Sequence, residues 1–189
     1  MASSSSTPGI LYVTMQPHPG LKLAQFHEWY NNEHGPTRLA IPSIFASGLR
    51  YRTTSPGGGS SSSPEFMAVY DVRDMALLET PTYTRLRANR SPREAATIAH
   101  VDVRRSFYDL LHTKQAAAFK PIETLSDAEA QGIVTVAVEI SLTAEDGAAA
   151  AYQSWYVEEH AELLAKVPGW LRSRLFKTLH GYAAPHRRL

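Results

Sequence analysis

The residues in this chain best suited to chemistry form a short motif, Trp-Tyr-x-x-Glu-His, that occurs twice. The first copy runs from Trp29 to His34 and the second from Trp155 to His160, at a constant offset of 126 residues. On an α-helix, residues four apart share a face, so Trp29 is expected above Glu33 and Tyr30 above His34. An imidazole, whose ordinary pKa is about 6.5, can transfer protons to or from a small molecule when it lies beside a phenol and an aromatic wall.

The first copy is the stronger candidate for a catalytic site, because His34 precedes a Gly35-Pro36 step where the helix is expected to kink or break. In this hypothesis His34 is the general acid/base and Tyr30 donates a hydrogen bond to a developing enolate. Glu33 orients the histidine, and Trp29 forms a wall of the site. The alternative is structural: the two aromatic rings are the core-facing side of an amphipathic helix, and Glu33-His34 ends that helix.

Further residues are predicted to bind substrate. The guanidinium groups of Arg38 and Arg50 could hold a carboxylate or an enolate, although solvated arginines on a strand are the commoner arrangement. The second copy contributes three more candidates: Trp155, Tyr156 and His160. No His-x-x-x-His or His-x-His spacing occurs among the eight histidines, so no metal site is predicted. No glycine-rich phosphate loop precedes a helix, so no nucleotide or other cofactor is predicted either.

Composition narrows the class of protein. The 189 residues carry 19 basic and 18 acidic side chains, so the net charge of +1 gives no electrostatic footprint for nucleic acid. The sequence has no cysteine, which excludes disulfides and thiolate chemistry. No apolar run approaches the roughly 20 residues that span a bilayer, and the Ser-rich start does not read as a secretory signal. We therefore expect a cytoplasmic protein with a small-molecule substrate and neither a nucleic-acid nor a membrane partner.

The repeated motif belongs to a longer internal similarity. Over 24 ungapped positions, residues 26–49 and 152–175 share seven identities, where unrelated pairing gives about one or two. Hydrophobic patterning predicts strands near 10–15, 45–54, 66–72 and 101–111, with helices over 21–40, from Asp74 through Leu86, and over 92–99. The first half therefore has the order βαββαβ.

The second half repeats only part of that order. A strand over 132–138, a helix over 147–166 and a strand over 170–179 are predicted, and only ten residues follow Leu179. Four segments result: a disordered N-terminus (1–8), a first repeat (9–113), a linker (114–131) that could hold a helical turn or two, and a truncated second repeat (132–189). A homodimer is one way to cover the edge that an incomplete repeat exposes.

With Trp-Tyr-x-x-Glu-His followed by a proline and an arginine-rich strand, in a βαββαβ unit, the sequence resembles the EthD-like branch of the dimeric α/β-barrel superfamily, in its tandem-duplicated fungal form. The resemblance implies an α+β fold of two ferredoxin-like repeats packed as a barrel-type pseudo-dimer. It also implies His34 as a pocket residue, with His160 as its duplicate. The activity expected from it is a cofactor-independent lyase, which decarboxylates or dehydrates an aromatic or polyketide-like carbonyl compound. A non-catalytic ligand-binding or accessory protein and an oxidoreductase or monooxygenase-like enzyme are the alternatives.

Overall fold

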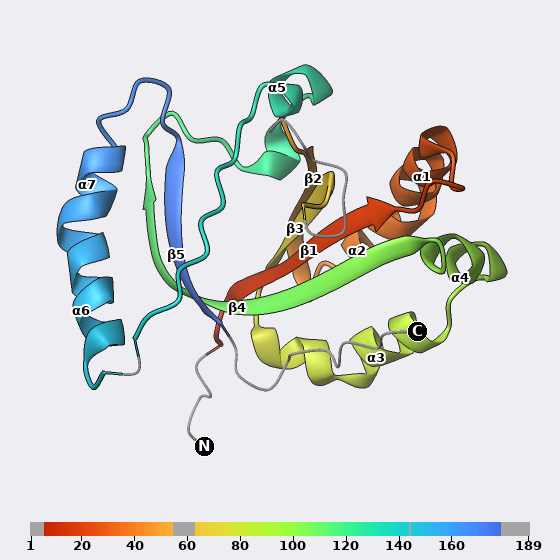
Figure 1. Ribbon diagram of the computed structural model, residues 1–189, viewed down its shortest axis with the longest axis horizontal. Helices are drawn as coiled ribbons and strands as arrows, with labels where there is room; N and C mark the ends of the chain where they lie inside the picture. Colours follow the sequence, from red (N-terminus) through yellow and green to blue (C-terminus); the bar gives the residue numbers. More distant parts are fainter. Residues whose placement is uncertain (1–5, 55–62, 144, 179–189) are drawn as a thin grey trace. The chain divides into compact units, whose positions relative to one another are not determined.

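The computed structural model describes residues 6–54, 63–143 and 145–178, and it divides the chain into two compact units (Figure 1). The first unit extends to Asp109 and includes Thr178; the second comprises Leu110–Lys177. Both contain helices and strands, so the fold class is α+β, as predicted. The expected disorder of the first residues and most of the Ser/Gly-rich loop after Thr54 lie outside the described residues.

The first unit has the predicted order βαββαβ, with short helical turns added to its crossovers. Its elements are β1 (Gly9–Pro17), α1 (Leu23–Trp29), η1 (Tyr30–His34), α2 (Gly35–Leu39), β2 (Phe45–Arg52), β3 (Phe66–Val72), η2 (Met75–Glu79), α3 (Pro81–Ala88), α4 (Pro92–Ile98) and β4 (Val101–Gln115). Strand β4 continues beyond Asp109 into the second unit. The prediction of Asp74 as a helix cap is confirmed, because its Oδ1 accepts a hydrogen bond from the backbone N–H of Ala76 at 3.2 Å.

The strand order of the sheet is β2-β3-β1-β4-β5. Strand β1 is central in the first unit, with antiparallel neighbours on both sides: Val13 lies opposite Ala68 of β3 and opposite Arg105 of β4. Strand β2 pairs antiparallel with the outer side of β3. The order 2-3-1-4 in a βαββαβ unit is the ferredoxin-like topology, so this part of the fold prediction agrees with the structure.

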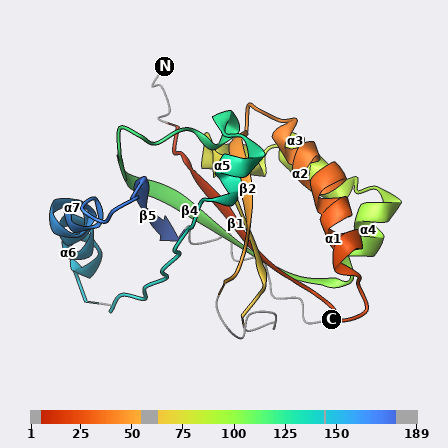
Figure 2. The same cartoon turned by 90° about the horizontal axis from the view of Figure 1, so that it is seen from above.

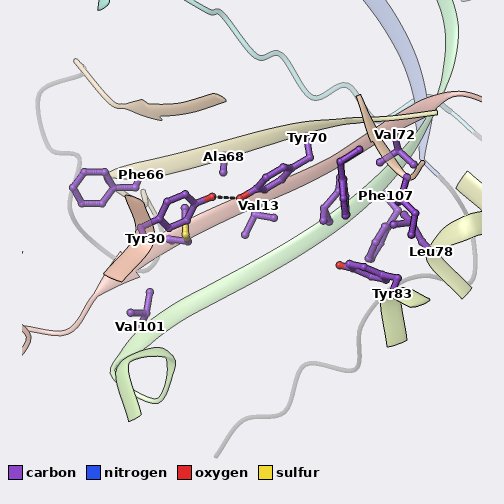
Figure 3. Close-up of a cluster of buried hydrophobic side chains, with 14 of the residues drawn as sticks. Val13, Tyr30, Phe66, Ala68, Tyr70, Val72, Leu78, Tyr83, Val101 and Phe107 are labelled. Atoms are coloured by element: carbon purple, nitrogen blue, oxygen red, sulfur yellow. Dashed lines mark hydrogen bonds between the residues drawn. The ribbon is translucent and has the colours of Figure 1, made fainter. Parts of the chain in front are cut away.

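The core of the first unit lies between one face of its sheet and the helices. Burial alternates along the strands: Phe66, Ala68, Tyr70 and Val72 of β3 are buried while the residues between them are half-buried. Figure 3 shows these side chains in one cluster with residues from β1, β4 and the helical segments. Figure 2 shows α1, α2 and α4 together on one side of the strands of this unit. The helix that carries the first motif is therefore anchored to the sheet by its apolar face.

The second unit contains a helix and a strand that repeat the local order of the first motif. Its elements are the end of β4, η3 (Ile122–Thr124), α5 (Asp127–Gln131), α6 (Ala148–Trp155), η4 (Tyr156–His160), α7 (Ala161–Leu164) and β5 (Arg172–Thr178). The series α6-η4-α7-β5 corresponds to α1-η1-α2-β2. The prediction of helical turns in the linker is also correct, since Ser126 and Glu129 form a capping box at the start of α5.

The prediction of a strand over residues 132–138 is wrong. This segment has no strand pairing in the described part of the chain, and Val134, Val136 and Val138 are 83%, 82% and 74% exposed. Its counterpart β1 is stabilised by a strand on each side, and β-branched residues favour strands largely through such packing. In the described part of the second unit the strands are β5 and the end of β4, which neighbour each other. The alternating valines alone therefore do not form a strand here.

No helix within the described residues is long and apolar enough to cross a membrane.

Candidate functional site

Both copies of the motif form a π-helical turn rather than a continuous α-helix. In the first copy the turn η1 spans Tyr30–His34, and the backbone N–H of Gly35 donates to the carbonyl of Tyr30, five residues earlier. In the second copy η4 spans Tyr156–His160, and the N–H of Ala161 donates to Tyr156 in the same way. Single π-helical turns are rare in proteins as a whole, but many of those that do occur lie at functional sites.

The predicted kink at Gly35-Pro36 takes the form of this π-helical turn, and the helix continues directly into α2. Pro36 has no N–H to donate, and it sits in the first turn of α2, where a proline is tolerated. A Cβ added at Gly35 would lie 3.2 Å from the carbonyl oxygen of Tyr30, so the turn requires a small residue there. Alanine fills the equivalent position 161.

The wider turn changes which side chains meet. The His34 ring contacts Tyr30, as predicted, with ring centroids 5.1 Å apart. It also contacts Trp29, at 4.6 Å, which a regular α-helix would not have placed beside it. His34 is 6% exposed, Tyr30 5% and Trp29 1%, so all three rings are part of the packed interior. The indole Nε1 of Trp29 is buried, and the structure gives it no hydrogen-bond partner among the described residues.

His34 is paired with a carboxylate that the sequence did not point to. Its Nδ1 lies 2.8 Å from Oε1 of Glu94 on α4, and both side chains are buried. Burial is the main cause that lowers the pKa of His34, to about 4, and nearby Arg38 and Arg105 add to the decrease while Glu94 opposes it. The hydrogen bond from His34 lowers the pKa of Glu94, and Arg38 and Arg90 act in the same direction.

Both pKa values are lowered, so at neutral pH the favoured state of the pair is a neutral His34 beside an ionised Glu94. Glu94 is an ionised carboxylate, which can only accept, so Nδ1 of the neutral His34 carries the proton and donates it. The other ring nitrogen, Nε2, then has a free lone pair and is the basic atom of the ring. No hydrogen-bond partner for Nε2 is present in the described part of the chain.

Glu94 is held in place by the start of α4. Ser91 is the N-cap, and its Oγ accepts a hydrogen bond from the backbone N–H of Glu94 at 2.9 Å. The same hydroxyl donates to the carboxylate of Glu33, which also lies 3.5 Å from Nε of Arg93. Glu33 therefore contacts the α4 start and not the His34 ring. A series of hydrogen bonds through Ser91 and Glu94 connects it to His34.

Tyr30 is joined to the sheet through a second tyrosine. The hydroxyls of Tyr30 and Tyr70 lie 2.6 Å apart in the core (Figure 3). Burial and the neighbouring Tyr70 raise the pKa of Tyr30 well above its ordinary value, so its hydroxyl stays protonated. The Tyr70 ring can approach the backbone of β2 closely because residue 48 is glycine: an added Cβ would be 2.6 Å from Cδ1 of Tyr70.

The two predicted arginines have different surroundings. Arg38 is 5% exposed, and its Nη1 donates to the backbone carbonyl of His34 at 2.8 Å. The guanidinium carbon of Arg50 lies 4.6 Å from the centre of the Tyr30 ring, and its Nη2 donates to Nδ1 of His27 at 3.0 Å. Arg38 is thus beside the His34–Glu94 pair, whereas Arg50 packs on the aromatic rings.

The second motif reproduces the rings without the carboxylate. His160 stacks on Trp155, with centroids 4.7 Å apart, and lies 5.6 Å from Tyr156. Trp155 is 40% exposed, and within the described residues no acidic group is paired with His160. These three candidates form a group within the second unit, while Trp29, Tyr30, Glu33, His34, Arg38 and Arg50 form the group in the first.

Sequence analysis did not identify three residues of the first candidate site: Tyr70, Glu94 and Arg105. The run Ser91-Pro92-Arg93-Glu94 is a typical helix start and places Glu94 at the third helical position. Alternation along β4 could have placed Arg105 on the same face as buried Phe107. Among the described residues, no group of three or more histidine and acidic side chains is arranged to hold a metal ion.

Comparison with known proteins gives one weak similarity. No protein-family model matches the chain, and no curated protein matches it. Among solved structures, the chain is similar to an ethyl tert-butyl ether degradation (EthD) family protein of Bacillus halodurans, at 17% sequence identity and a TM-score of 0.36. The match covers 51% of this chain and 95% of the other. A similarity of this size does not assign the chain to a family.

Proposed function

We propose that the first unit is an EthD-like domain that acts on an aromatic or polyketide-like carbonyl compound by proton transfer through His34, without a cofactor. The observation that carries the proposal is the buried pair of His34 and Glu94, with Nδ1 and Oε1 2.8 Å apart. A carboxylate that fixes one imidazole nitrogen as a donor leaves the other as a base. The motif and the ferredoxin-like strand order are what link the unit to EthD-like proteins.

The reaction that fits this base best is dehydration. Nε2 of neutral His34 takes a proton from the carbon next to the substrate carbonyl, and the electron pair of that C–H bond forms an enolate. The enolate then forms a carbon–carbon double bond as hydroxide leaves the adjacent carbon, and the imidazolium returns its proton to the hydroxide as water. Decarboxylation instead needs a protonated histidine after CO₂ has left. The pKa of His34, lowered to about 4, favours the sequence that begins with the neutral ring.

Two neighbouring groups suit the enolate. Tyr30 keeps its hydroxyl proton, because burial and Tyr70 raise its pKa well above the ordinary value, and a neutral phenol donates to an oxyanion. The indole N–H of Trp29 is a buried donor with no partner in the described structure. Because both side chains are nearly inaccessible, substrate entry requires α1–η1 or α4 to move locally.

A second candidate function is non-catalytic binding, as an accessory protein. The observation that favours it is the burial of His34, Tyr30 and Trp29, which pack as core residues do. A protein of this kind binds a small molecule without changing it. It also tolerates His34→Gln, since glutamine can replace the hydrogen bond to Glu94.

Mass spectrometry of candidate carbonyl compounds incubated with the protein separates the two functions. The enzyme hypothesis predicts loss of 18 mass units as water, at a rate reduced about 100-fold or more by His34→Gln. The matched control is His18→Gln, which changes a half-exposed histidine that is paired with Asp102 and is not among the candidate site residues, and it should leave turnover unchanged. Full activity of the His34 variant contradicts the proposal, and ligand binding without a product supports the accessory role.

A further inference from the structure

A cluster of guanidinium groups with too few carboxylates lies beside His34. Arg38 comes from α2, Arg105 from β4, Arg87 from α3, and Arg90 from the turn before α4. The positive charges of Arg87, Arg38 and Arg90 each lower the pKa of Arg105, and Arg105 in turn lowers the pKa of His34. The charges of Arg38 and Arg90 also lower the pKa of Glu94, whose carboxylate is already hydrogen-bonded to His34.

Arg105 is the central member of this cluster. Its register opposite Val13 puts it on the face of β4 that also carries the buried Phe107, and its side chain is half-buried. Burial is the main cause that lowers the pKa of Arg105, to about 10, and the neighbouring arginines lower it further. None of these four arginines has an ion pair with a described carboxylate.

An arrangement of this kind is unfavourable in the free protein. A half-buried guanidinium normally has a carboxylate partner, because desolvation of the charge is otherwise uncompensated. Arg105 has no such partner among the described residues, and the charges of Arg87, Arg38 and Arg90 disfavour its own charge. A planar carboxylate can accept two parallel N–H bonds from one guanidinium, so an anionic ligand would supply the missing partner.

Accessibility differs among the four arginines. Arg38 is buried and Arg105 is half-buried, whereas Arg87 and Arg90 are exposed. The cluster therefore includes exposed arginines of α3 and of the turn before α4, and a buried one, Arg38, that is hydrogen-bonded to the backbone of His34. Exposed cations of this kind attract an anion from solution, and the inner ones fix its orientation.

We propose that Arg105 and Arg38 form an anion subsite beside His34, with Arg87 and Arg90 at its solvent-exposed rim, and that it binds the carboxylate of the substrate. This preference for a carboxylate extends the proposed function. It rests on that function for one point, that His34 is the group that acts on the bound molecule. The substrate class is thereby narrowed to carboxylate-bearing carbonyl compounds. Arg105 is the specificity-determining residue that the sequence motif did not include.

The subsite can be tested by calorimetric titration of the whole chain with benzoate, using the neutral benzamide as the matched ligand. We expect saturable binding of benzoate that weakens at least tenfold in Arg105→Gln and is partly retained in Arg105→Lys. Arg104→Gln is the control, because the neighbouring Arg104 is exposed and lies on the opposite face of β4. The affinity of this variant for benzoate should stay within twofold of the wild type. A tenfold preference for benzoate over benzamide should disappear in Arg105→Gln.

Benzoate binding that is absent, that is equal to benzamide binding, or that is unchanged in Arg105→Gln overturns the subsite. A structural role for Arg105 predicts a lower melting temperature for Arg105→Gln, whereas a binding role predicts an equal or higher one, since an unpaired charge is removed. Benzoate binding is measured without turnover and in chains in which His34 is unchanged. Failure of the subsite is thus separable from failure of the catalytic proposal, which depends on turnover in the His34 variant.

Discussion

Nδ1 of His34 lies 2.8 Å from Oε1 of Glu94, a residue 60 positions further along the chain, and both side chains are buried. The contact joins the π-helical turn of the first motif to the N-terminus of α4. It sets the tautomer of the histidine and leaves Nε2 as the basic atom. The proposed chemistry depends on this pair.

Acid should destabilise the protein through His34. In the unfolded chain its pKa has the ordinary value of 6.5, and in the folded protein it is about 4, so the unfolded state binds more protons between these values. The contribution of His34 is fully present above pH 6.5 and is lost as the pH falls toward 4. The loss amounts to roughly 3 kcal/mol. Urea denaturation between pH 4 and 7.5 measures it.

The control for this pH dependence is His34→Gln, which cannot titrate. Its unfolding free energy should change less with pH between 6.5 and 4 than that of the wild type. The lowered pKa of Glu94 adds a loss of stability below its ordinary value, and His34→Gln retains the part of this loss that a glutamine hydrogen bond to Glu94 and the nearby arginines preserve. Parallel pH profiles for the two proteins would show that His34 titrates normally.

The Tyr30–Tyr70 hydrogen bond should couple the helix to the sheet. Tyr70→Phe leaves the buried Tyr30 hydroxyl without its 2.6 Å partner, at a cost of about 1–3 kcal/mol in unfolding free energy. Tyr30→Phe should cost a similar amount. The double variant should cost less than the sum, because it leaves no unpaired hydroxyl. Additive losses in chemical denaturation contradict a bond between these groups.

Gly48 should not tolerate a side chain. A Cβ there would lie 2.6 Å from Cδ1 of Tyr70, so Gly48→Ala should displace the ring and lower the unfolding free energy by about 1–3 kcal/mol. Gly132→Ala is the matched control: the nearest atom is 3.5 Å away and the backbone is right-handed helical. Thermal denaturation should show the control equal to or slightly more stable than the wild type.

Ser91→Ala tests the positioning of Glu94. It removes the helix cap, which should lower the unfolding free energy by about 1 kcal/mol. It also loosens the start of α4, which holds the carboxylate near His34. Because Glu94 raises the pKa of His34, the variant should have a still lower histidine pKa by NMR titration. Ser126→Ala removes an exposed cap on α5 and should leave that pKa unchanged. Equal effects of the two variants would refute the positioning role.

The sequence predicted the elements of the first unit, because its strands alternate in hydrophobicity and its turns carry strong signals. It also predicted the Tyr30–His34 contact from helical spacing. It could not predict the π-helical turn. A backbone hydrogen bond to the fifth rather than the fourth preceding residue produces no pattern of residue types that distinguishes it from an α-helix. Glu94 was missed because capping residues reveal where a helix starts but not what lies opposite it.

The error in the second half has a different cause. Residues 132–138 have the alternation and valine content of a strand, and they are the counterpart of β1 in the repeated sequence. Strand formation depends on neighbours on each side, which a local pattern does not report. The two motifs are alike in sequence and in backbone, yet Glu94 lies beside His34 and no described acidic group is paired with His160. This difference also depends on tertiary contacts that the local sequence does not report.

The most direct test of the central claim is ¹⁵N NMR of the protein labelled at histidine, titrated from pH 8 to pH 3.5 in the wild type and in Glu94→Gln. We predict that His34 at pH 7 is neutral, with its proton on Nδ1, and that its pKa is about 4. The pKa should fall further in Glu94→Gln, because the carboxylate that stabilises the imidazolium is removed. A proton on Nε2 at pH 7, or a pKa near 6.5 that is unaffected by Glu94→Gln, would contradict the account.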